Sequence, residues 1–190
     1  MGFDTTRFPF LNFRDEAAFW RDIEGLKKFF QNYREELQGV FRKGAELKAA
    51  FLELDPLVEE LTNKICPYCG TVCCANRHGF PEFADIVSML AMEEEIPRYD
   101  LGVDERDLCQ FLSRSGCILP RYRRPYRCTW YFCDPMLVEV DIGPIKRYRN
   151  FLRLVTLLSQ KRGELLEEFF KIYMEKARPN DPPGKSPHGP

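Results

Sequence analysis

The first third of the chain carries one apolar pattern. Between residues 15 and 61, apolar side chains recur in alternating steps of three and four, with a single gap at Gly44. The pattern is formed by Phe19, Ile23, Leu26, Phe30, Tyr33, Leu37, Val40, Leu47, Phe51, Leu54, Val58 and Leu61. Such a heptad seam is typical of a helix that packs along its length against another helix. We therefore expect a long N-terminal helix region with the seam as its buried face.

Pro56 lies inside this pattern, directly after Asp55. Because proline has no backbone N–H to donate, we expect either a kink here or a stop followed by a new helix that Asp55 caps. In both cases residues 19–54 form one continuous helix, roughly 54 Å long at about 1.5 Å per residue.

A second helical pattern runs from residue 144 to about residue 177. Pro144 suits a first helical turn. An apolar stripe follows at Ile145, Tyr148, Leu152, Val155, Leu166, Phe169 and Tyr173, and Ser159 and Arg162 interrupt it. Since a single isolated helix would leave this stripe in water, the sequence predicts an antiparallel pair with residues 19–54 against 145–174. The alternative is a compact bundle with the central region, and the interrupted stripe also leaves room for a homodimer.

Between the two helical patterns the chain is rich in turn residues. We expect one modest helix from about Pro81 to Glu94 and a second short helix that begins near Asp104. The end of the chain, from about Arg178, is rich in Pro and Gly and is predicted to be disordered. The predicted domains are a long helix region at 1–62, a cysteine-cluster domain at 63–135, a long helix at 136–178 and a tail at 179–190. The fold class is mainly α: a long antiparallel helical hairpin carrying a compact, turn-rich cysteine domain.

The net charge and the hydropathy of the chain argue against nucleic-acid or membrane binding driven by overall charge and against a membrane-spanning segment. The formal net charge is −1 over 190 residues, so no global field attracts the chain to nucleic acid or to a membrane surface. The sequence shows neither an apolar run long enough to cross a bilayer nor a signal peptide. We therefore expect a cytoplasmic protein, where thiols stay reduced and clustered cysteines indicate metal or redox chemistry rather than disulfides.

All eight cysteines lie in the central region, and half of them crowd the stretch KICPYCGTVCCANRHGF. They are Cys66, Cys69, Cys73, Cys74, Cys109, Cys117, Cys128 and Cys133. CPYCG has the form of a metal knuckle, in which a tight turn aims two thiolates at one ion and the glycine lets backbone amides approach the sulfurs. A thioredoxin-type redox site shares the CxxC motif, but no βαβ pattern surrounds it here.

The division of the eight thiols stays open at this point. Four thiolates complete a structural zinc site or a cubane iron–sulfur cluster, so eight supply two sites, or one site plus reserve or redox thiols. Cys73 and Cys74 would point to opposite sides of an extended chain. A helical turn would instead place Cys69 and Cys73 on one face.

Five arginines and no acidic residue lie between Cys109 and Cys133. The arginines are Arg114, Arg121, Arg123, Arg124 and Arg127. A four-thiolate zinc site carries a charge of about −2, which is costly to bury unless positive groups lie nearby. The arginines therefore fit a buried anionic metal centre, and the alternative is a solvated basic loop.

At these residues the chain resembles the YkgJ-type cysteine-cluster family, described as a zinc- or iron-chelating domain. CPYCGTVCC is similar to the family's CxxCGxCC opening, and LCQFLSRSGCILPRYRRPYRCTWYFC is similar to its later run. The resemblance covers residues 64–135, with one extra residue before Cys73 and one after Cys117. It implies that all eight cysteines are candidate ligands for zinc or iron, with an iron–sulfur cluster as one form of the iron. It implies no established reaction.

The leading hypothesis is therefore a metal-binding protein whose zinc or iron is structural or redox-active. The second hypothesis is a nucleic-acid-binding protein that uses residues 121–132. Arginines there would contact phosphates, and Tyr122, Tyr126, Trp130 or Tyr131 would stack on bases.

The third hypothesis is an iron–sulfur oxidoreductase or a protein-modifying enzyme that carries the cysteine domain, as flagellin lysine methylases carry a similar cysteine pattern. His78 is the histidine placed to act there as a ligand or proton carrier, and the alternative is a surface histidine. Glu82 and Asp85, beside the cysteines, are expected to begin a helix rather than to act as acid or base.

Overall fold

The structure is a computed structural model that describes residues 3–70 and 72–176. The tail predicted at 179–190 lies outside the described residues. The elements in chain order are η1 Thr5–Arg7, α1 Glu16–Asn32, α2 Gln38–Ile65, η2 Cys66–Tyr68, α3 Asn76–Gly79, α4 Phe83–Ala91, β1 Leu112–Ser113, β2 Gly116–Cys117, η3 Arg121–Arg123, α5 Arg127–Trp130, α6 Asp134–Asp141 and α7 Ile145–Lys176. The expectation of a mainly α fold is confirmed.

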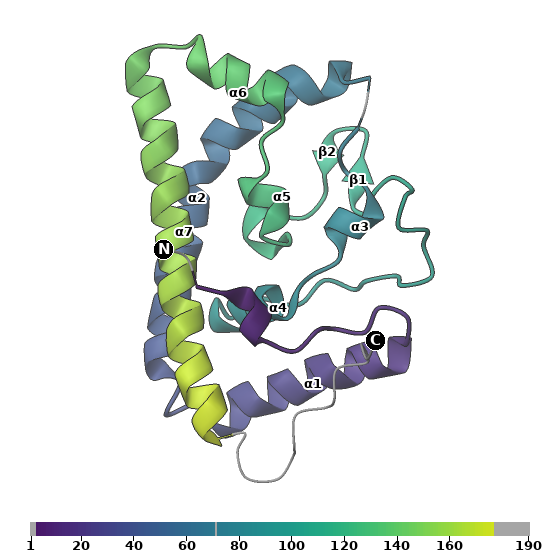
Figure 1. The fold of residues 1–190 in the computed structure, drawn as a ribbon, viewed down its shortest axis with the longest axis vertical. Helices are drawn as coiled ribbons and strands as arrows, with labels where there is room; N and C mark the ends of the chain where they lie inside the picture. The colour runs from purple at the N-terminus through teal and green to yellow at the C-terminus, as the bar shows by residue number, and fades with distance from the viewer. Residues whose placement is uncertain (1–2, 71, 177–190) are drawn as a thin grey trace, which may run out of the picture.

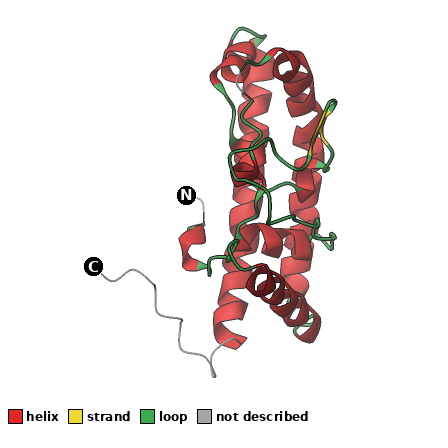
Figure 2. Ribbon diagram, turned by 90° about the vertical axis from the view of Figure 1, so that its right-hand side faces the viewer, coloured by secondary structure: helices red, strands yellow, loops and turns green. Residues whose placement is uncertain are grey.

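The two longest helices, α2 and α7, pack against each other and run in opposite directions (Figure 1). α6 crosses the far end of α2 and leads the chain into α7. The side view shows the two long helices along the longest axis (Figure 2). Residues 66–80 and 92–133, which precede and follow α4 and carry the cysteines, are named the cysteine region. α7 spans Ile145–Lys176 within the described residues, which agrees with the helix predicted from residue 144 onward.

The prediction of one continuous helix over residues 19–54 is wrong at residues 33–37. α1 ends at Asn32, and Tyr33 to Leu37 form a turn in which the Leu37 N–H donates to the Tyr33 carbonyl (2.9 Å). α1 then packs on α4, while Phe30 near its end stacks on Phe169 of α7 (5.3 Å between ring centroids). The predicted pairing of residues 19–32 with the C-terminal helix is therefore wrong over most of α1.

The predicted buried face is nevertheless correct on both sides of this turn. Every seam position from Phe19 to Leu61 is buried except Tyr33, which is half-buried. The turn at residues 33–37 keeps the spacing of three and four residues between apolar positions. The buried faces of α1 and α2 therefore belong to one continuous sequence pattern and pack into the same core.

α2 continues through Pro56 without a stop, and Asp55 is a residue of its interior rather than a cap. Proline removes the N–H that would donate to the carbonyl of residue 52. Both Leu52 and Pro56 are exposed, so water can satisfy that carbonyl. The alternative of a new helix capped by Asp55 is wrong.

Gly44, the single gap in the seam, is the place where α4 meets α2. A Cβ built at Gly44 would lie 2.0 Å from the carbonyl oxygen of Ala91 at the end of α4. Glycine is required here because a backbone atom occupies the space that a side chain would take. The gap therefore marks a close helix contact.

The predicted apolar stripe of the C-terminal helix is correct at Leu166 and Phe169, which are buried, and has the wrong register in the first half of the helix. Ile145 and Leu152 are exposed, while the buried face of α7 consists of Phe151, Leu154, Leu158, Arg162, Leu165, Leu166 and Phe169. Arg162 occupies a position in the buried face of α7. Because the prediction expected only apolar residues there, it placed the buried face on the neighbouring side of the helix. The Arg162 guanidinium pairs with Asp85 (3.0 Å), so the charged side chain at this core position has its counter-ion within the chain.

α4 lies between α1, α2 and α7 and is almost entirely buried. Glu82 and Asp85 form a capping box at its start, which confirms their expected role as helix-start residues. The short helix expected near Asp104 is absent, and residues 101–107 form turns. Asp104 instead accepts the Arg106 N–H with its side chain (2.8 Å), as aspartate does in turns.

Candidate metal centre

The first cysteines sit where α2 ends. The Cys66 N–H donates to Thr62 and so closes the last turn of α2, and the Cys69 N–H returns to the Cys66 carbonyl (3.2 Å). This tight turn is the geometry that the CPYC motif predicts for a metal knuckle. Cys69 and Cys73 lie outside any helix, so the alternative of a helical turn that places them on one face is wrong.

Cys133 joins this end of α2 from the other side of the cysteine region. It is the N-cap of α6, and α6 packs against α2. An ion pair between Lys64, in the last turn of α2, and Glu139, in the last turn of α6, also links the two helices. The chain thus returns to Cys66 after 67 positions, the difference between the residue numbers 133 and 66.

A second neighbourhood forms around α3, α5 and the β1–β2 hairpin. The Cys109 N–H donates to the Cys74 carbonyl (2.9 Å), and Cys117 lies on β2 opposite Leu112. Cys128 belongs to α5, which packs on α3, and its Sγ lies 3.3 Å from the His78 carbonyl.

Two buried residues hold this second neighbourhood in place. The Asn76 side chain bonds the Asp104 carbonyl and the Gln110 N–H (both 2.8 Å), which fixes the loop that carries Cys109 beside Cys74. Gly79 leaves room for sulfur, because a Cβ there would lie 2.7 Å from Cys109 Sγ. The sequence pattern gave no periodic signal for either role.

Burial and the charges of neighbouring thiols both act on the cysteines of this region. Burial raises the pKa of Cys66, with further contributions from the thiols of Cys73, Cys133 and Cys69. Burial likewise raises the pKa of Cys128 to about 12, with contributions from Cys109, Cys117 and Cys74. Although residue 128 is exposed as a whole, its sulfur points inward to the His78 carbonyl, which explains the desolvated thiol.

Cys74 connects the two neighbourhoods. Burial raises its pKa to about 12, and its thiol interacts with Cys73, Cys109, Cys66 and Cys117. The eight cysteines span 68 residues of sequence, and the fold brings them close enough for the charge of one thiol to affect its neighbours. Across residues 3–70 and 72–176, no three Cys, His, Asp or Glu side chains converge as ligands around one point.

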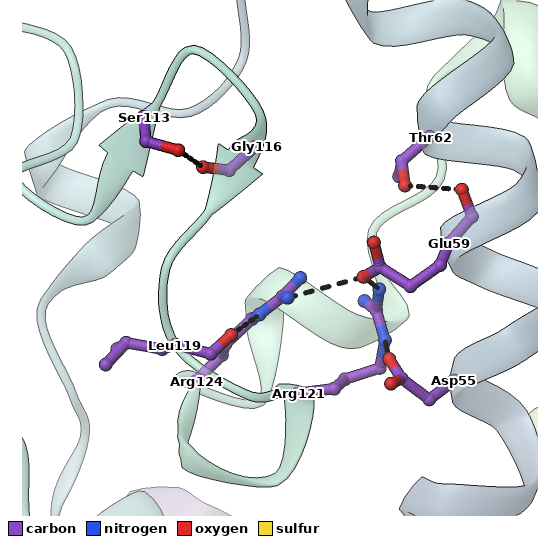
Figure 3. Close-up of polar contacts among 8 residues, drawn as sticks. All are labelled: Asp55, Glu59, Thr62, Ser113, Gly116, Leu119, Arg121 and Arg124. Carbon is purple, nitrogen blue, oxygen red and sulfur yellow. Dashed lines mark hydrogen bonds and ion pairs between the residues drawn. The ribbon is translucent and has the colours of Figure 1, made fainter.

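Three arginines of the cysteine region have carboxylate partners on α2 or at the start of α4. Arg121, 2% exposed, donates to Asp55 of α2 (2.6 Å) and pairs with Glu59, which Arg124 also contacts (3.3 Å; Figure 3). Arg127 pairs with Glu82 (2.8 Å). These three arginines attach the cysteine region to α2 and α4, whereas the sequence predicted that they would neutralise thiolates.

Three buried polar atoms near Cys109 and Cys128 have no hydrogen-bond partner among the described residues: Tyr99 Oη, Thr129 Oγ1 and Arg123 Nε. Tyr99 is 2% exposed, and burial raises the pKa of its hydroxyl, as do the charges of Asp85, Cys128 and Cys109, whereas Arg123 lowers it. Unpaired donors beside thiols suit an anionic thiolate centre, because a metal-bound thiolate accepts hydrogen bonds that a protonated thiol accepts poorly. The donor set and its surroundings therefore fit a metal of the zinc or iron type.

His78 lies on α3, half-buried, and its Nε2 accepts a hydrogen bond from the Arg77 side chain (3.1 Å). Desolvation, with the charges of Arg77 and Arg127, lowers the pKa of His78. This environment favours the neutral imidazole, and the contact to Arg77 occupies one of its two ring nitrogens.

No protein-family model, curated protein or solved structure matches the chain. The resemblance to the YkgJ-type family therefore stays a prediction from the cysteine motifs. Among the helices of the described residues, none has both the length and the apolar composition for crossing a membrane.

Proposed function

We propose that this protein binds zinc or iron through its eight cysteines, with an iron–sulfur cluster as one form of the iron. In this proposal the antiparallel pair of α2 and α7 carries the cysteine region as a metal-binding domain. The observation that carries the proposal is that the fold brings together cysteines from both ends of a 68-residue segment. The Cys109 N–H bonds the Cys74 carbonyl, and Cys133 begins α6, which packs on the helix that Cys66 ends.

Thiolate ligands suit both zinc and iron, so the ligand type does not choose between them. The metal would hold the turn-rich segment folded, with a free energy on the order of 10–16 kcal/mol by analogy with zinc fingers. This chain's residues would supply the thiolates, the backbone amides of the knuckle and the hydroxyl of Tyr99 beside them.

Anaerobic purification of the full chain tests this proposal. We expect bound zinc, or iron with sulfide and visible absorption, and a loss of this metal when all eight cysteines are changed to serine. The matched control changes the eight residues Ser88, Ser113, Ser115, Ser159, Thr5, Thr6, Thr62 and Thr156 to alanine and should keep the metal. A folded wild-type chain that binds neither added Zn²⁺ nor iron, with all thiols open to titration, would refute the proposal.

Nucleic-acid binding is the second candidate function, because Trp130 and Tyr131 are exposed next to basic residues. Against it, Arg121 is buried and Arg124 and Arg127 are paired with carboxylates, which removes charge that would meet phosphates. Binding of a single-stranded oligonucleotide that weakens steeply with added salt would support this candidate, and no binding at low salt would end it.

A further inference from the structure

We propose that the eight thiols form two adjacent four-thiolate metal centres whose ligands interleave along the chain. The first centre takes Cys66, Cys69, Cys73 and Cys133, and the second centre takes Cys74, Cys109, Cys117 and Cys128. The inference rests on the proposed function, because it assigns the same cysteines to separate metal ions. It differs from a division in chain order, in which residues 66–74 would supply one centre and residues 109–133 the other.

Cys133 belongs to the first centre because the fold returns it to the end of α2. Cys66 ends α2, Cys133 begins α6, and α6 packs on α2 beside the Lys64–Glu139 ion pair. Cys69 belongs with Cys66 because its N–H donates to the Cys66 carbonyl (3.2 Å), and Cys73 is the next cysteine of the same segment. The later cysteines Cys109 and Cys117 are joined through the β1–β2 hairpin, where the Leu112 N–H donates to the Cys109 carbonyl and Leu112 pairs with Cys117.

Cys74 belongs to the second centre because its backbone is bonded to that of Cys109. The Cys109 N–H donates to the Cys74 carbonyl, and the adjacent Ala75 forms a β-bridge with Leu108. Asn76 fixes the same loop through its side chain. Cys128 approaches from α5, which packs on the helix that directly follows this bridge.

The Cys73–Cys74 pair is the boundary between the two centres. Neither residue lies in a helix, and the Cys74 carbonyl accepts the Cys109 N–H, whereas the Cys73 carbonyl accepts the Ala75 N–H. The backbone therefore ties Cys74 to the loop of Cys109, while Cys73 is the last cysteine of the segment that leaves Cys66. The dense motif therefore supplies three ligands to the first centre and one to the second.

The two centres have different surroundings. Tyr99 Oη and Thr129 Oγ1, both buried and without a partner among the described residues, belong to the neighbourhood of the second centre. They are donors that a charged four-thiolate centre would orient toward its sulfurs. Among the described residues, the four side chains of each set do not converge on one point. Metal binding would draw them together, as happens where metal binding is coupled to folding.

Co²⁺ titration of the reduced full-length chain tests this division, since Co²⁺ occupies thiolate sites and its charge-transfer absorption reports sulfur ligation. Four double variants carry the same number of substitutions. C66S/C133S and C74S/C109S each damage one interleaved centre, whereas C66S/C74S and C109S/C133S damage both. Far-UV circular dichroism of each variant establishes that the helices are intact.

The wild-type chain is expected to take up two Co²⁺ ions at four-thiolate sites, four ligands to each. C66S/C133S and C74S/C109S should keep half of the charge-transfer absorption, and C66S/C74S and C109S/C133S should lose it. The reverse pattern would establish the division in chain order, and equal loss in all four variants would establish a single shared site. Either result overturns this inference and leaves the proposed function standing, whereas a wild-type chain that binds no Co²⁺, Zn²⁺ or iron overturns both.

Discussion

The guanidinium of Arg162 lies 3.0 Å from the carboxylate of Asp85, and both side chains are buried in the helical core. The same carboxylate accepts the Tyr126 N–H (3.1 Å), and the guanidinium lies over the Tyr126 ring, 4.2 Å from its centroid. One ion pair therefore joins α4, α7 and the cysteine region.

Removing one partner of this pair is expected to be costly. Asp85→Asn leaves the Arg162 charge buried without its anion and should lower the free energy of unfolding by about 3–5 kcal/mol. The double variant Asp85→Asn with Arg162→Met removes the stranded charge, so it should be more stable than Asp85→Asn alone. Urea unfolding followed by circular dichroism measures both, and a single variant as stable as wild type would contradict the expected burial.

Gly44→Ala should destabilise the chain, because the new Cβ would meet the Ala91 carbonyl at 2.0 Å. A backbone atom cannot rotate away, so we expect a loss of about 1–3 kcal/mol. The control is Gly25→Ala in α1, where nothing lies within 4 Å. That change should stabilise the helix by about 0.5–1 kcal/mol. Thermal or urea unfolding compares the two, and equal effects would mean that α4 does not approach α2 so closely.

Arg121→Gln is expected to loosen the attachment of the cysteine region to α2. The buried guanidinium bonds Asp55 and Glu59, and hydrogen bonds to charged groups contribute about 1.5–3 kcal/mol. Arg153→Gln is the control, since its ion pair with Glu53 is exposed on both sides and should contribute about 1 kcal/mol or less. Limited proteolysis of the cysteine region, together with urea unfolding, would separate the two, and similar behaviour of both variants would argue against an anchoring role.

Tyr99→Phe should weaken the second centre without removing a ligand. If the hydroxyl donates to a metal-bound thiolate, its loss should lower metal affinity by about 10- to 100-fold, as losses of outer-shell donors do. The exposed Tyr131 provides the control Tyr131→Phe. Competition of the protein with a chelator for Zn²⁺ measures the affinity, and C74S/C109S, which lacks the second centre, should show no further loss from Tyr99→Phe.

The metal-free chain should lose stability at alkaline pH. Burial raises the pKa of Cys74 and Cys128 to about 12 from an ordinary 9.0, so the folded state favours the protonated thiols. This contribution is complete below pH 9 and is lost as the pH rises toward 12. The urea midpoint of the reduced, metal-free chain should fall over this range, and it should fall less in C74S/C128S. An identical fall in both chains would assign the effect to other groups.

The sequence pattern predicted the core of the N-terminal region better than its helices. Apolar spacing identifies which residues are buried, and the turn at Tyr33–Leu37 keeps that spacing, so the change of direction leaves no trace in it. In α7 the helix itself was predicted correctly, whereas much of its buried face was not. Arg162 is a charged residue at a core position, and only its distant partner Asp85 explains why it can be there.

The candidate site was predictable by residue type and not by arrangement. The motifs identified the cysteines, and the spacing predicted the turn between Cys66 and Cys69. The return of Cys133 to the end of α2 depends on the packing of α6, and the position of Cys109 depends on side-chain bonds from Asn76. Such long-range contacts have no local signal. An acidic pair four residues apart, Asp55 and Glu59, was the available signal for a partner of Arg121.

The packing of α2 against α7 joins parts of the chain that lie on either side of the cysteine region. A protease that cuts between Cys66 and Cys133 would therefore leave two fragments that stay bound through this helix pair. Such a nicked protein would run as two bands in a denaturing gel and elute as one species from a sizing column. Because α4 lies between Cys66 and Cys133 and packs on both α2 and α7, the nicked protein would keep one shared core.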